Sequence, residues 1–274
     1  MAPAPAERPV ASDLTRRAAA GVVMALVAGL VIVLDGWLFV AVLMVIVVLA
    51  AREWANLTLQ ASRAHYAIAG IVLLPLTALL ATHLARLDPP ILMLGALMLL
   101  LSLWLIVSVG GWRERGWVVF GMLYLGLPAV SLLALRDLPD GLHLTVWLVV
   151  VVVSTDVFAY LVGRNVGGPK LAPRISPGKT RSGLAGGMAA AAIAGALLAG
   201  LTGWGWLPAG LCGALLALVA QCGDLFESAI KRRAGVKDSG SLIPGHGGVL
   251  DRLDGFLFAA PVFTLLVALD SAGS

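Results

Sequence analysis

The amino-acid sequence predicts an all-α, polytopic integral membrane protein with about nine transmembrane helices and a cytoplasmic N-terminus. Of its 274 residues, 60% are hydrophobic and 12% are charged, whereas about 25% of the residues of a soluble domain are charged. Apolar runs of roughly 20 residues, the length of a helix that crosses a bilayer, recur along the chain. Lys and Arg gather in alternate loops, as the positive-inside rule requires.

The expected elements follow from these apolar runs. Residues 1–15, which are rich in Ala and Pro, are expected to form a disordered lead. Arg16 and Arg17 precede the first run, which is interpreted as a helix because further spans follow, and not as a signal peptide. The expected spans cover residues 18–34, 37–51, 66–82, 91–109, 117–135, 143–162, 184–201, 207–223 and 255–269, the last extended back through Leu250.

Polar segments separate the spans. They cover residues 52–65, 83–90, 110–116, 136–141, 163–183 and 224–253. The segment 163–183 is rich in Gly, Pro and cations, so no regular helix suits it. Glu53 and the other acids of the short loops are expected to be solvated. The chain then divides into the lead, a five-span N-terminal bundle (16–142), and a C-terminal catalytic region (143–274) of four spans and two long loops.

The distribution of cations sets the expected topology. With a cytoplasmic N-terminus, the loops 52–65, 110–116, 163–183 and 224–253 are also cytoplasmic, and only Arg86 and Arg136 fall on the other side. The pI of about 9.4 then reflects this bias, so that anionic lipid headgroups, and not nucleic acid, are the expected partners. Because the two long loops share one face, they can build one site.

Four acids near the last two spans indicate a divalent metal. Asp224 and Glu227 lie three residues apart at the end of the eighth span, and Asp251 and Asp254 lie three apart at the start of the ninth. This spacing puts each pair on one face of a helix. Mg²⁺ needs few protein carboxylates and completes its shell with water and phosphate oxygens. The alternative is that these acids are solvated or form salt bridges.

Two further segments suit phosphate binding. The turn Pro-Gly-His-Gly-Gly (244–248) can present backbone N–H groups to anionic oxygens, and His246 can bind a phosphate or transfer a proton. Lys170, Arg174, Lys179 and Arg181 surround the sequence Ser-Pro-Gly-Lys-Thr at 176–180, and such cations suit a triphosphate or a lipid phosphate. The alternatives are a simple connection and a loop that only fixes the topology.

Asp156 lies inside the sixth span, with Tyr160 and Arg164 on successive turns. A carboxylate at membrane depth is costly, so it is a functional candidate. The alternative is a buried ion pair of Asp156 with Arg164 or with a Lys from elsewhere in the chain.

The segment 228–254 closely resembles the signature of the phosphatidate cytidylyltransferases, or CDP-diacylglycerol synthases. The pattern S-x-x-K-R, K-D, P-G-H-G-G, D-R-x-D is supplied by Ser228, Lys231, Arg232, Lys237, Asp238, Pro244, Gly245, His246, Gly247, Gly248, Asp251, Arg252 and Asp254. The residues Asp156, Ala159, Tyr160 and Gly163 resemble the family element D-x-x-A-Y-x-x-G, and 176–180 resembles S-P-x-K-T. Family members often carry an aromatic residue and then Glu or Gln after that threonine, where this chain has Arg181 and Ser182. The resemblance covers about residues 154–256.

The resemblance implies a nucleotidyltransferase that converts CTP and phosphatidic acid to CDP-diacylglycerol and pyrophosphate with Mg²⁺. It also implies a bacterial inner membrane protein with a cytoplasmic active site, and homodimers are common in the family. The expected catalytic residues are Asp224, Lys237, Asp238, Asp251, Arg252 and Asp254. The expected substrate-binding residues are Asp156, Tyr160, Ser176, Lys179, Thr180, Ser228, Lys231, Arg232, His246, Gly247 and Gly248. The expected metal ligands are Asp224, Asp251 and Glu227, with Asp156 as the candidate for a second cation.

Two other functions stay open. One is a CTP-dependent transferase or kinase that acts on another lipid, such as a polyprenol. The other is a membrane transporter of anionic solutes in which Asp156 is the coupling acid. Substrate competition distinguishes the first, and solute uptake without CTP turnover distinguishes the second.

Overall fold

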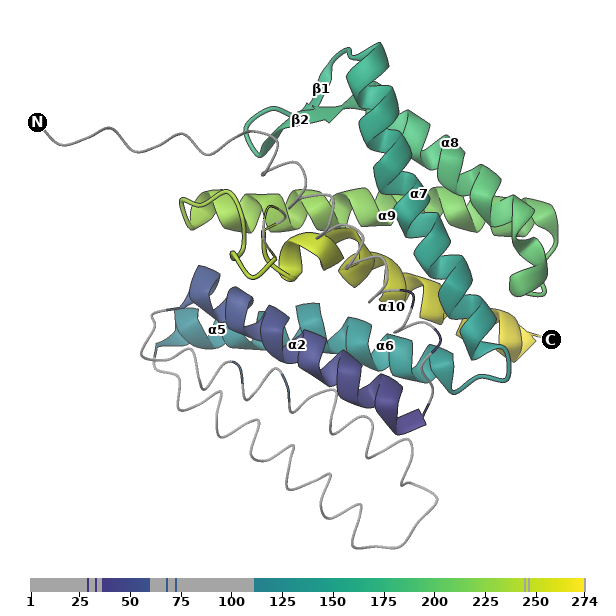
Figure 1. Ribbon diagram of the computed structural model, residues 1–274, viewed down its shortest axis with the longest axis horizontal. Helices are drawn as coiled ribbons and strands as arrows, with labels where there is room; N and C mark the ends of the chain where they lie inside the picture. The colour runs from purple at the N-terminus through teal and green to yellow at the C-terminus, as the bar shows by residue number, and fades with distance from the viewer. Residues whose placement is uncertain are drawn as a thin grey trace, which may run out of the picture.

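The computed structural model describes residues 29, 33, 36–59, 68, 72, 111–243, 245 and 247–273. This part of the chain is mostly helical (Figure 1). Five of its helices are long and apolar enough to cross a membrane, namely Gly36–Thr58, Trp112–Arg136, Gly141–Val166, Trp206–Arg233 and Leu250–Ala272. They correspond to five of the expected spans. Apart from single residues, the expected spans 18–34, 66–82 and 91–109 lie outside the described part.

Two helices of the N-terminal half are longer than predicted. Helix α2 (Gly36–Thr58) passes through Arg52 and Glu53, which were expected in a polar loop. Helix α5 (Trp112–Gly121) begins inside the predicted basic turn and continues through the π-helix η2 (Met122–Gly126) into α6 (Leu127–Arg136). The predictions were wrong at these ends because hydropathy reports contact with lipid, whereas helical hydrogen bonding continues into the polar interface.

The prediction that no regular helix suits residues 163–183 is confirmed for 167–180 and is wrong at both ends of the segment, where helices that end at Val166 and begin at Arg181 extend into it. Helix α7 (Gly141–Val166) leads into a hairpin of β1 (Lys170–Ala172) and β2 (Ser176–Thr180), so the described chain is not entirely α-helical. The two strands pair antiparallel, with Lys170 opposite Thr180. Pairing satisfies backbone groups in a segment whose Pro and Gly residues prevent a helix.

The remaining helices also cover the expected spans. Helix α8 (Arg181–Leu197) and the 3₁₀ turn η3 (Ala199–Leu201) fill the seventh. Helix α9 (Trp206–Arg233) continues ten residues beyond its expected end at 223, which shortens the predicted loop 224–253 to 234–249. Helix α10 (Leu250–Gly273) begins at Leu250 as predicted and contains Pro261.

Small residues let α8 approach α7 closely. Gly183, Gly187, Ala191 and Gly195 are buried along one face of α8. A Cβ atom on Gly187 would lie 2.8 Å from the carbonyl oxygen of Thr155. Helices that associate in lipid gain little from the hydrophobic effect, so close packing of small residues supports their contact.

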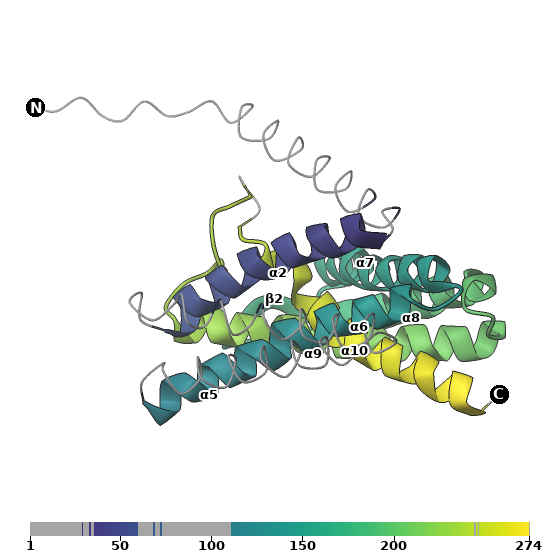
Figure 2. The ribbon, with the colours of Figure 1, turned by 90° about the horizontal axis from the view of Figure 1, so that it is seen from below.

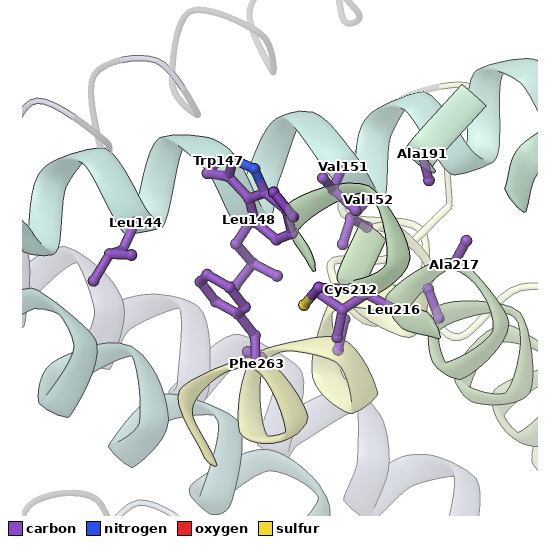
Figure 3. Close-up of a cluster of buried hydrophobic side chains, with 14 of the residues drawn as sticks. Leu144, Trp147, Leu148, Val151, Val152, Ala191, Cys212, Leu216, Ala217 and Phe263 are labelled. Carbon is purple, nitrogen blue, oxygen red and sulfur yellow. The ribbon is translucent and has the colours of Figure 1, made fainter. Parts of the chain in front are cut away.

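Aromatic side chains fill two buried clusters. In the C-terminal half, the rings of Trp147 and Phe263 stack with centroids 4.8 Å apart (Figure 3), and Trp147 Nε1 donates to the carbonyl of Gly195 at 3.1 Å. In the other cluster, Tyr124 of η2 packs against Trp54 of α2 and against Phe226 of α9, with centroid distances of 5.1 and 5.3 Å. This second cluster joins the two halves of the chain.

The polar ends of the helices gather on one side of the molecule. The C-terminal ends of α2 and α9 and the first turns of α5 and α10 lie together, at the left of Figure 1; Figure 2 shows the same arrangement from below. At the opposite ends, Trp204 Nε1 donates to Asp270 Oδ2 at 2.7 Å. The segments 163–183 and 224–253, which were expected to share one face of the membrane, are in contact, because the hairpin contacts α9.

Candidate functional site

The hairpin is tied to α9 at a charged pair. Lys179 of β2 forms an ion pair with Asp224 of α9, and both side chains are mostly buried. Ser228 Oγ donates to Asp224 Oδ1 at 3.3 Å. One turn further along α9, Arg232 Nε donates to the carbonyl of Ile175 at 3.3 Å. Two residues that were predicted to bind substrate, Lys179 and Ser228, thus contact the predicted metal ligand Asp224, and a third, Arg232, contacts the hairpin.

Acids from three helices act on one another at this site. The negative charges of Asp156 on α7, Asp224 on α9 and Asp254 on α10 repel one another. The positive charges of Lys179 and Arg252 act on Asp156 in the opposite sense. Three neighbouring carboxylates leave a local excess of negative charge, which attracts cations.

Lys231 lies between two of the predicted metal ligands. Its Nζ atom is 3.0 Å from Glu227 Oε1 and 2.6 Å from Asp251 Oδ1. The Glu227 side chain is fully buried, and Lys231 and Asp251 are buried as well. Because an unpaired buried charge is very costly, the ammonium group of Lys231 needs these neighbouring acids as partners. The structure thus separates the acids into a group around Asp224 and a pair held by Lys231.

Asp251 also holds the loop that precedes its own helix. Its Oδ2 atom accepts hydrogen bonds from Ser239 N at 2.8 Å, Ser239 Oγ at 3.0 Å and Gly248 N at 2.7 Å. With Lys231 on Oδ1, both carboxylate oxygens of Asp251 are in use.

Glu53 is the residue that the sequence did not reveal. It is 7% exposed, so the expectation that it is solvated was wrong. Its carboxylate accepts hydrogen bonds from the N–H groups of Val249 and Leu250 and from the hydroxyl of Ser239. The first N–H groups of a helix have no partner within that helix, so a carboxylate is stable there. No local pattern links position 53 with the loop, so only the three-dimensional arrangement reveals the contact.

The glycines of the Gly-rich turn leave room for these carboxylates. A Cβ on Gly247 would lie 2.5 Å from Asp251 Oδ2, and a Cβ on Gly248 would collide with Glu53 Oε2 and Ser239 Oγ. The N–H of Gly248, which was expected to be available for a phosphate, donates to Asp251. His246 and Pro244 lie outside the described residues, so their predicted part in the turn stays a prediction.

Several other predicted residues have local roles or are accessible. The Thr180 hydroxyl caps α8 by accepting the N–H of Gly183 at 3.0 Å, and Ser176 begins β2. Arg164 donates to the Tyr160 hydroxyl at 3.0 Å, and this hydrogen bond was not predicted. The remaining predicted site residues, which are exposed, are Lys237, Asp238 and Arg252.

The donor atoms around Asp224 suit a magnesium ion that binds together with phosphates. Within the described ranges, no group of three or more His, Cys, Asp or Glu side chains is arranged to hold a metal by itself. Mg²⁺ typically uses one or two protein carboxylates and takes its other oxygens from phosphates and water. Asp156 and Asp254 offer such carboxylates beside Asp224, which is itself paired with Lys179, whereas Glu227 and Asp251 are held by Lys231.

Helices long and apolar enough to cross a membrane, with carboxylates and cations gathered toward one set of helix ends, are typical of an integral membrane protein with a polar site at one side. The comparison with known families is more specific. A model described as the cytidylyltransferase family matches residues 15–270. The chain belongs to this family.

Individual relatives agree with this assignment. A protein of Brucella abortus biovar 1 (strain 9-941) is 51% identical over 170 residues, which are 60% of this chain and 62% of that protein. A protein of Pseudomonas aeruginosa is 39% identical over 255 residues, 85% of this chain and 89% of the relative. A protein of Bacillus subtilis is 39% identical over 182 residues, 65% and 68% respectively. Each is named phosphatidate cytidylyltransferase. The chain thus spans about three fifths of the length of the Brucella relative.

Proposed function

We propose that this protein is a phosphatidate cytidylyltransferase, which converts CTP and phosphatidic acid to CDP-diacylglycerol and pyrophosphate. The observation that carries the proposal is the family match over residues 15–270, together with the name of the relatives. The contacts of Lys179 with Asp224 and of Lys231 with Asp251 support it, because these residues come from the part of the chain that resembles the family.

The chemistry needs charge compensation more than a protein nucleophile. An oxygen of the lipid phosphate attacks the α-phosphorus of CTP, a new P–O bond forms, and the bond to the β-phosphate oxygen breaks to release pyrophosphate. The two reactants are polyanions that repel each other, so positioning and cationic groups supply most of the catalysis. Lys179, Arg232, Lys237 and Arg252 are the cations at this end of the molecule that would contact phosphates.

Magnesium is part of the proposal. Asp224 would hold it together with substrate phosphates, and Asp156 or Asp254 would hold a second cation. When bound, the ion offsets negative charge on the phosphates and orients them. Lys231 bridges Glu227 and Asp251, and the hydrogen bonds of Asp251 hold the loop beside the acids.

A location in the inner membrane of a bacterium, with the site on the cytoplasmic side, is also proposed. Its support is that all described Lys and Arg residues except Arg136 lie toward the helix ends that carry the site. CTP is available on that side, and positive residues favour it. A homodimer is proposed from the family resemblance alone.

The test is an assay of purified protein in detergent micelles that contain CTP and phosphatidic acid, with and without Mg²⁺. CDP-diacylglycerol and pyrophosphate are measured together, and both are expected only when lipid and metal are present. Folded protein that gives neither product with several phosphatidates would overturn the proposal. A polyprenol substrate in the same assay, and solute uptake into proteoliposomes, would then test the alternatives.

A further inference from the structure

Glu53 connects the N-terminal half of the chain with the polar loop 234–249. It lies near the end of α2 and binds residues that follow it by 186 to 197 positions in the sequence. Oε1 accepts the N–H of Val249 at 2.9 Å, and Oε2 accepts the N–H of Leu250 at 2.8 Å. The carboxylate therefore fixes the point at which α10 begins.

Ser239 joins this carboxylate to the one of Asp251. Its hydroxyl oxygen is 2.8 Å from Glu53 Oε2 and 3.0 Å from Asp251 Oδ2. A hydroxyl has one proton to donate, so it serves one carboxylate at a time, while Ser239 N donates to Asp251 throughout. The resulting chain of contacts runs from Glu53 through Ser239 and Asp251 to Lys231.

The loop is shaped to receive Glu53. A Cβ on Gly240 would lie 2.8 Å from Glu53 Oε1, and one on Gly248 would meet Oε2. Two glycines in the loop thus contact the same carboxylate closely. The buried carboxylate, its three donors and the missing side chains at 240 and 248 form one fitted contact between α2 and the loop.

We propose that Glu53 is a positioning residue for the transfer reaction, an inference that rests on the proposed function. It holds the loop and the start of α10 so that Asp251, Lys231 and Asp254 keep their places beside Asp224. The hydrogen bonds described for Glu53 are with Ser239, Val249 and Leu250. Glu53 therefore affects the reaction by positioning other residues. The N-terminal bundle thereby contributes directly to the geometry of the site.

The first experiment compares Glu53→Gln with Glu114→Gln in the full chain. Glutamine keeps the shape of Glu53 but turns an NH₂ group toward an N–H donor. We expect kcat to fall about 10²-fold, because small misplacements of reacting groups cost that much, with KM for CTP changed less than about threefold. Glu114 lies at the start of α5, where its carboxylate accepts the N–H of Gly111, and its variant is expected to keep wild-type kcat. A Glu53→Gln protein with a lower melting temperature but wild-type kcat per folded molecule would show a purely structural role and overturn the proposal.

The second experiment does not depend on activity. Hydrogen exchange of the Val249 and Leu250 amides is measured in the same proteins, and Glu53→Gln should speed it about tenfold or more. Unchanged exchange would overturn the proposal that Glu53 holds the loop and the start of α10. If the wild-type protein gave no product, the proposed function would be overturned, and the exchange rates would still test whether Glu53 holds the loop.

If the Glu53→Gln protein does not fold, the Ser239→Ala variant tests the positioning role instead. It removes the hydroxyl that joins the two carboxylates and leaves their backbone donors in place. We expect a loss of kcat of about tenfold, and wild-type kcat would overturn the proposal.

Discussion

At the scale of the residue, Lys231 shows why paired carboxylates are ambiguous in a sequence. Glu227 and Asp251 were predicted to share a metal ion, and in the structure they share the ammonium group of Lys231. Oxygen atoms attract a lysine and a divalent cation alike. Spacing along a helix identifies which acids face the same way, but the partner depends on which other side chains reach them.

Replacing Lys231 by Met should destabilise the protein by about 3–5 kcal/mol, because two buried carboxylates lose their counter-charge. Thermal unfolding in detergent micelles measures the effect. Lys170→Met, on an exposed strand residue, is the control and should stay within about 0.5 kcal/mol of wild type. Adding Glu227→Gln to Lys231→Met should recover part of the loss, and a double variant no more stable than the single one would contradict this explanation.

Substitution of Asp224 is the clearest test of the proposed magnesium site. Asp224→Asn should lower kcat by about 10²-fold or more, because the charge that would face Mg²⁺ and the phosphates is lost. Turnover is measured over a range of Mg²⁺ concentrations, with Asp140→Asn in the turn before α7 as the control. Asp251→Asn is a less specific test because it also disturbs Lys231, Ser239 and Gly248. Unchanged turnover and Mg²⁺ dependence in folded Asp224→Asn protein would exclude this residue as a ligand.

At the scale of the element, the packing of α8 against α7 depends on the small residues along the buried face of α8. Gly187→Leu should separate α7 from α8, because its Cβ alone would lie 3.1 Å from Ala159 Cβ. Forcing extra atoms into a packed contact costs about 1–3 kcal/mol or more. Ala189→Leu, at an exposed position of the same helix, is the control for helix propensity and hydrophobicity. Equal melting temperatures for the two variants in micelles would show that the contact tolerates a large residue.

The ends of the helices mark the limit of sequence-based prediction. The centres of α7, α9 and α10 lie where the apolar runs predicted them, because hydropathy reports which residues can face lipid. Helices α2 and α9 continue through charged residues at their C-terminal ends, where that signal stops. The hairpin also went unpredicted, since its two short strands carry no alternating pattern and depend on contacts with α9.

At the scale of the whole molecule, the ion pair between Lys179 and Asp224 agrees with the topology predicted from the cations. Asp140 and Lys170 flank α7, so they should lie on opposite sides of the membrane. Single cysteines at these positions, in a background with Cys212 and Cys222 replaced, can be labelled with a membrane-impermeant maleimide. The cysteine at 170 should react only in inside-out vesicles, and the one at 140 only in intact cells. The reverse pattern would place the site outside the cytoplasm.

Most of the candidate site could be predicted from residues 154–256, where the family signature lies. The signature residues Lys231 and Asp251 do come together, and the signature residue Lys179 contacts the predicted metal ligand Asp224. What could not be predicted is how they are held, because the burial of Glu53 and the role of Ser239 depend on contacts between distant parts of the chain. The spacing of residues in the sequence indicates which side chains are neighbours on one helix. It does not indicate that a carboxylate of another helix contacts them.

The carboxylate of Glu53 has a consequence for protein engineering. Chimeras that exchange the N-terminal half between family members would combine halves that evolved with different partners. Such a hybrid should work only when the donor half has an acid at the position of Glu53 near the end of α2 and the recipient half keeps glycines at 240 and 248. Compatibility between the halves would then depend on a few atoms at one helix end and not on overall sequence identity.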